Sequence, residues 1–182
     1  MRGETNDNKK VHSEMKELKK SLIAEHRERN PGVFVRRELI FWLLAAMVGT
    51  RLLYALLSTA LFLMHGLDVP AFEYFQMFFM VLVALGFSHI IYSAGVIGAA
   101  YLALAGGIFS LFRAFTDGVF FIMTGAGDAI LSAIMLIFVA TIIIQIVTMA
   151  FISVDSKCKL YVQMRAEVSK EMQEWVKANK NN

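Results

Sequence analysis

Arg51 is the residue whose type and position point most directly to chemistry. It follows Trp42 by nine residues in an apolar stretch, which corresponds to about 13 Å along a helix. An arginine at the centre of a membrane helix costs about 2.5 to 3.5 kcal/mol unless it faces a bundle interior, water or a polar partner. Two interpretations follow. Arg51 binds an anion or lines an oligomeric pore, or it only fixes packing by bonding backbone carbonyls or extending toward the cytoplasm.

Polar residues on other apolar stretches supply the remaining members of a candidate ligand or ion pathway. They are Tyr101, Thr141 and Gln145, together with His89. A histidine near the end of a span can act as a proton relay because it titrates near neutral pH. The alternative for His89 is a hydrogen-bonded packing residue. No carboxylate appears at the expected depth of Arg51, so the sequence assigns it no acidic partner.

Small residues recur every four positions along one stretch, at Gly95, Ala99, Ala103 and Gly107. Because side chains of this size let two helix backbones approach closely, the pattern predicts a helix packing face in a membrane. The face can pack against another helix of the same chain or against a second copy.

Proteolytic chemistry and metal binding have less support in the sequence. The run Gly125–Asp128 resembles the G-x-G-D pattern of intramembrane aspartyl proteases, and that resemblance implies a second aspartate, for which Asp68 and Asp117 are available. The alternative is that Asp128 caps a helix N-terminus. The histidines form no i, i+4 pair and Cys158 is the only cysteine, so we expect no metal site and no cofactor. We assign the chain to no family.

The charge pattern identifies the elements that would hold these residues. Between Arg37 and Lys157 the only basic residues are Arg51 and Arg113, and 57% of the chain is hydrophobic, with a mean hydropathy of +0.57. Four apolar stretches fill this interval, at about 38–65, 72–92, 95–112 and 128–154. Each reaches or approaches the roughly 20 residues that cross a bilayer. The connector 113–127 is interpreted as a re-entrant or interfacial turn.

The predicted fold is therefore all-α: an integral membrane four-helix bundle with cytoplasmic amphipathic N- and C-terminal helices. Residues 1–37 form a basic amphipathic tail, residues 38–154 the four-span domain, and residues 155–182 a helical extension of the fourth span. The two tails hold ten and six of the 18 basic residues. An even number of spans and the positive-inside bias place both termini in the cytoplasm, in a plasma or bacterial inner membrane.

Each tail has an apolar stripe at helical spacing, from Val11 to Leu22 and from Tyr161 to Trp175. The stripes can pack on each other, lie along the membrane with lysines toward anionic lipid, or pair between subunits. Acidic residues interleave with the basic ones, which argues against nucleic-acid binding.

These features predict a non-enzymatic membrane protein that works as a homo-oligomer or as a subunit with other membrane subunits, in ion or small-solute transport. The alternatives are a scaffold that recruits a soluble partner through its tails, and an intramembrane enzyme that uses Asp128.

Overall fold

The computed structural model describes residues 4–64, 66, 71–123 and 129–180, and the elements within these ranges are helical. They are α1 (Glu4–Arg29), α2 (Pro31–Met64), α3 (Ala71–His89), a π-helical turn η1 (Ile90–Ala94), α4 (Ile97–Met123), α5 (Ala129–Val154) and α6 (Ser156–Lys180). The all-α prediction is confirmed for these ranges.

Three helical segments in the described ranges are long and apolar enough to cross a membrane: Pro31–Met64, Ala71–Ala94 and Ser132–Val154. They correspond to the first, second and fourth predicted spans. The third predicted span is represented by a shorter apolar segment, Ile97–Phe112, inside the longer helix α4. The expected turn after Phe112 does not begin there, because α4 continues as helix to Met123.

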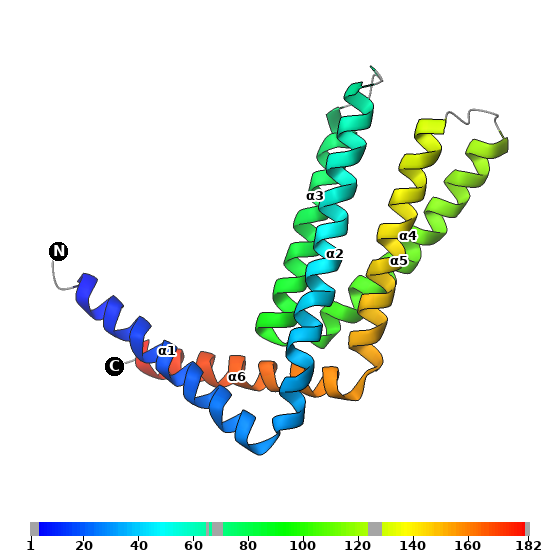
Figure 1. Ribbon diagram of the computed structural model, residues 1–182. Coiled ribbons are helices and arrows are strands. Elements are labelled where there is room, and N and C mark those ends of the chain that lie inside the picture. The colour runs from blue at the N-terminus through cyan, green and yellow to red at the C-terminus, as the bar shows by residue number, and fades with distance from the viewer. Residues whose placement is uncertain (1–3, 65, 67–70, 124–128, 181–182) are drawn as a thin grey trace.

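Two helical hairpins, α2–α3 and α4–α5, stand side by side in Figure 1. Helix α2 packs against both α3 and α5, and α4 packs mainly against α5, whereas α3 and α4 share few contacts. The helices thus lie in the order α3, α2, α5, α4. In this open arrangement the last helix does not pack closely against the first, and the predicted four-helix bundle is not confirmed.

The break between α1 and α2 lies at an asparagine–proline pair. Asn30 separates the helices and Pro31 is the first residue of α2, a position at which the missing amide hydrogen of proline costs no helical bond. The Val33 amide donates to the Asn30 carbonyl over 3.1 Å. Helix α1 consequently turns away from the spans and lies against α6 (Figure 1).

The predicted continuation of the last span into the C-terminal tail is not observed, because the chain turns at Asp155. Its side-chain Oδ1 accepts a hydrogen bond from the Cys158 amide at 2.8 Å, which is the N-cap geometry that opens a new helix. Helix α6 then runs across the ends of the spans (Figure 1). The α1 and α6 helices together form what we call the base of the molecule.

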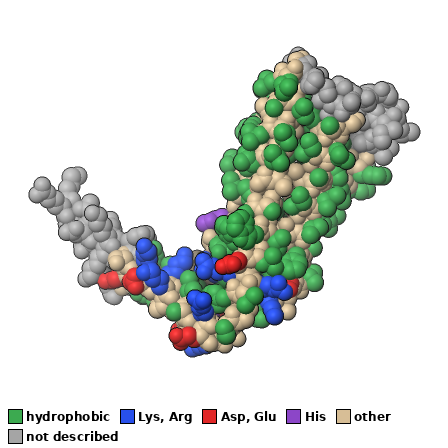
Figure 2. All heavy atoms as spheres, in the orientation of Figure 1, with side chains coloured by type: hydrophobic (Ala, Val, Ile, Leu, Met, Phe, Trp, Pro, Cys, Tyr) green, Lys and Arg blue, Asp and Glu red, His purple; other side chains and the backbone are tan. Residues whose placement is uncertain are grey.

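Hydrophobic packing is concentrated where the base meets the spans. The larger buried cluster takes residues from α2, α3, η1, α4, α5 and α6, and α1 packs against it through Leu22 and Ile23. A smaller cluster of Ala55, Met77 and Val81 joins α2 to α3 farther out. Figure 2 shows lysine and arginine side chains gathered over the base and hydrophobic ones over the spans.

Candidate functional site at the helix seams

Arg51 lies buried at the seam between α2 and α5, with 6% of its surface exposed. Its Nη2 donates a hydrogen bond to Gln145 Oε1 over 2.7 Å. Its Cζ also lies 5.8 Å from the ring centroid of Phe138, on the face side that attracts cations. The guanidinium is therefore held by a neutral amide and an aromatic ring, both on α5.

Gln145 extends this contact to a third helix. Its Nε2 donates to the Ala103 carbonyl of α4 over 2.8 Å, while its Oε1 accepts from Arg51. One glutamine side chain thus joins α2, α5 and α4 inside the apolar part of the molecule. Such a contact fixes helix register, because the alternative is a polar group left in hydrocarbon.

The other predicted pathway residues do not join this contact. Thr141 is buried one turn before Gln145, and its hydroxyl donates to the Phe138 carbonyl of its own helix at 2.8 Å. Tyr101 on α4 is 48% exposed. His89 is exposed at the end of α3, with its Nδ1 3.4 Å from the Ser93 hydroxyl. The structure therefore brings Arg51 and Gln145 together and leaves Tyr101 and His89 elsewhere.

The small-residue face of α4 meets two different partners within the chain. Ala99 and Ala103 are buried, and a Cβ added to Gly107 would lie 3.0 Å from Ile146 Cγ1 of α5. Gly95 caps η1 with a φ of +71°. A Cβ there would lie 2.2 Å from the Ala166 nitrogen and 2.3 Å from the Val162 oxygen of α6.

The junction around Tyr92 was not identified as a site from the sequence. Arg165 of α6 donates from Nε to the Tyr92 carbonyl over 3.1 Å and lies over the Tyr92 ring at 6.0 Å. Arg37 of α2 donates to the Tyr92 hydroxyl over 3.2 Å. These contacts join residues far apart in sequence, so no local sequence pattern predicts them.

Cys158 and Tyr161, on the first turns of α6, are buried in the same junction. Burial, together with a smaller contribution from the nearby Asp155 carboxylate, raises the pKa of the Cys158 thiol to about 12. The pKa of Tyr161 is likewise raised to about 12 by burial and by Tyr92. The Asp155 pKa is lowered, chiefly by the hydrogen bond from the Cys158 amide.

No group of three His, Cys, Asp or Glu side chains in the described ranges is placed to hold a metal ion. The motif at 125–128 and Asp68 lie outside the described residues, and so does the side chain of Asp117.

The described ranges are all-α, and three of their helical segments, long and apolar enough to cross a membrane, are compatible with a membrane protein. Comparisons with protein-family models, with curated proteins and with solved structures gave no match.

Proposed function

We propose that the protein is a non-enzymatic membrane subunit that works in an assembly, either with copies of itself or with other membrane subunits. The observation that carries this proposal is a set of glycines on the outward faces of the spans. They are Gly49 on α2, Gly86 on α3, and Gly98 and Gly106 on α4. All four are exposed, and a Cβ added at any of them would meet nothing within 4 Å.

Glycine in a helix interior is about 1 kcal/mol less favourable than alanine, and nothing inside the described part of this chain packs on these positions. Close approach of a neighbouring helix is the usual reason for small residues on a membrane helix face. The open order α3, α2, α5, α4 leaves faces of α3 and α4 available for such a neighbour.

In this proposal α4 crosses the membrane together with the three longer apolar helices, and the base lies at the cytoplasmic face. Both termini are at the base end of the spans in Figure 1. The basic side chains gather at that end (Figure 2), as the positive-inside bias requires of a cytoplasmic surface in a plasma or bacterial inner membrane.

The size of the protein in mild detergent, checked by crosslinking in native membranes, tests the assembly. We expect Gly106→Leu to release smaller species, because its side chain would occupy the space that a neighbouring helix needs. Ala140→Leu is the matched control, since Ala140 is exposed on α5. A wild-type protein that is monomeric in both measurements would refute the proposal.

A second candidate function, anion transport within such an assembly, is favoured by Arg51. Its charge is buried and its hydrogen-bond partner is a neutral amide, so the seam keeps a net positive charge. Flux of small anions into liposomes should fall for Arg51→Leu and persist in part for Arg51→Lys. Equal flux for wild type and Arg51→Leu would remove this candidate.

A further inference from the structure

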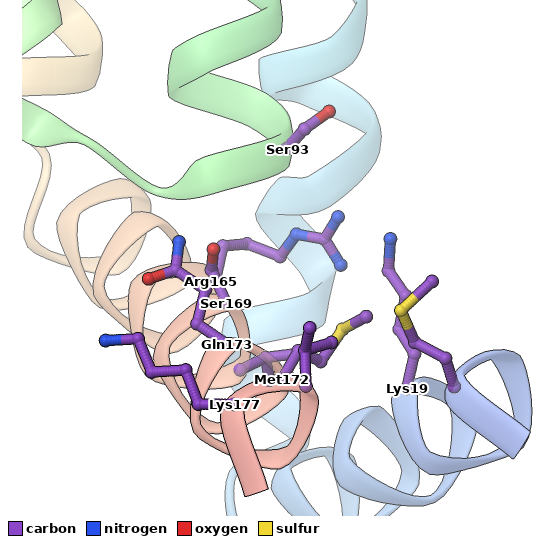
Figure 3. Close-up of a pocket in the computed structure, with 10 residues that line it drawn as sticks. Lys19, Ser93, Arg165, Ser169, Met172, Gln173 and Lys177 are labelled. Carbon is purple, nitrogen blue, oxygen red and sulfur yellow. The ribbon is translucent and has the colours of Figure 1, made fainter. Parts of the chain in front are cut away.

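A cavity of about 420 Å³ lies between α1, η1 and α6, at the point where the base meets the spans. Its lining includes Met15 and Lys19 of α1, Ser93 of η1, and Arg165, Met172 and Lys177 of α6. In Figure 3 the side chains of Lys19 and Arg165 reach toward the same side of the cavity, near Ser93, whereas Lys177 lies on the other side of α6.

The two cations at this side differ in how they are held. The Arg165 guanidinium is positioned through Nε, which donates to the Tyr92 carbonyl. No hydrogen bond to its two Nη groups occurs within the described ranges. Lys19 makes no ion pair or hydrogen bond there either, whereas the adjacent Lys20 pairs with Glu17 at 2.9 Å. A guanidinium fixed through Nε and a lysine ammonium facing one space suit an anion with several oxygens.

The remaining lining restricts what that anion can be. None of the lining side chains is acidic, and the other polar groups are the hydroxyls of Ser93 and Ser169 and the amide of Gln173. The rest of the wall is apolar, formed by Met15, Met172 and neighbouring valines. An amphiphilic ligand, with a phosphate next to hydrocarbon, matches this combination better than a fully hydrated ion does.

We propose that this cavity binds the phosphate headgroup of an anionic phospholipid from the cytoplasmic leaflet. Arg165 and Lys19 contact the phosphate, Ser93 donates to it, and the apolar wall contacts the glycerol end of the acyl chains. The location of the cavity, at the level where the spans end, is where a lipid headgroup lies. The choice of leaflet rests on the proposed function, which places the base at the cytoplasmic face.

Binding of short-chain phosphatidylglycerol to the full chain in a non-ionic detergent tests the proposal by native mass spectrometry. We expect Lys19→Gln to weaken binding about fivefold, and Lys19→Gln with Arg165→Gln about 25-fold, since each cation near a membrane surface contributes roughly equally. The matched control removes two exposed cations from the same helices outside the cavity, as Lys16→Gln with Lys170→Gln. It should retain binding within about twofold of wild type.

Three outcomes would overturn the proposal: an equal loss in the control, equal binding of phosphatidylcholine, or equally strong binding of free glycerol phosphate, which would make a soluble phosphate the ligand. Protection of Cys158 from maleimide verifies that each variant is folded. Because this assay needs neither an assembly nor a membrane orientation, tags that report the base outside the cell would refute the cytoplasmic placement while binding persists.

Discussion

The base and the outer parts of the spans are held together by different kinds of contact. At the base, η1 and α6 meet backbone to backbone at Gly95. Tyr92 accepts hydrogen bonds from Arg37 of α2 and from Arg165 of α6. Farther along the spans, the hairpins are joined through Arg51, Gln145 and the rings of Tyr54 and Phe138, whose centroids are 5.2 Å apart. The base is thus joined to the spans by a close backbone contact and by hydrogen bonds at Tyr92, whereas the outer contacts between α2 and α5 are made by side chains alone.

We expect Gly95→Ala to cause the largest loss of stability, because it separates α6 of the base from the spans. The new Cβ would lie 2.2 Å from the α6 backbone at a φ of +71°, so α6 must move and the left-handed conformation becomes strained. We expect a loss of about 3 kcal/mol, measured by thermal unfolding in detergent and by faster maleimide reaction at Cys158. Gly32→Ala, where the added Cβ meets nothing within 4 Å, should cause neither the loss of stability nor the faster maleimide reaction; a matching loss there would contradict this expectation.

Gln145→Leu should come next, because it leaves the Arg51 guanidinium buried without its hydrogen-bond acceptor. We expect a cost of about 2 kcal/mol. Arg51→Leu should cost less, since Gln145 keeps its bond to the Ala103 carbonyl, and the double variant should be no worse than Gln145→Leu. A double-mutant cycle of unfolding free energies measures the coupling, and strictly additive losses would show that the two side chains do not interact.

Asp155→Ala should have a smaller effect and act only on the start of α6. Loss of an N-cap costs about 1 kcal/mol, whereas Asp155→Asn keeps the cap and serves as the control. The Asp155 pKa is lowered in the folded chain, so its contribution is present above the pKa of the unfolded carboxyl and is lost as the pH falls through the lowered value. Circular dichroism melts should show this acid-side loss in wild type and not in Asp155→Asn; an identical pH profile would contradict it.

The last prediction concerns the wild-type protein and the rate at which maleimide modifies Cys158. The thiol is fully buried and its pKa is about 12, so it stays protonated and shielded at pH 8. Maleimide should modify it slowly in the folded protein and rapidly after denaturation in dodecyl sulfate. Equal rates in the two states would show that α6 is not docked on the spans.

The sequence predicts the elements of this fold better than their contacts. The interval poor in basic residues locates the apolar helices, and Asn30–Pro31 marks the end of α1, because both signals are local. The turn at Asp155 was missed although aspartate is a common N-cap, since neither glycine nor proline accompanies it. Arg51 and Gln145 were both selected as candidates, but their pairing depends on the register of α2 against α5. Gly95 was assigned to a packing face on α4, and its actual contact with α6 depends on a segment about 70 residues away.

The most direct measurement is the accessibility of tags on the two termini in intact cells, in permeabilised cells and after carbonate extraction. We expect both tags to be reached only after permeabilisation and the chain to stay in the carbonate-resistant membrane fraction. Tags on opposite faces of the membrane, or release of the chain by carbonate, would contradict it.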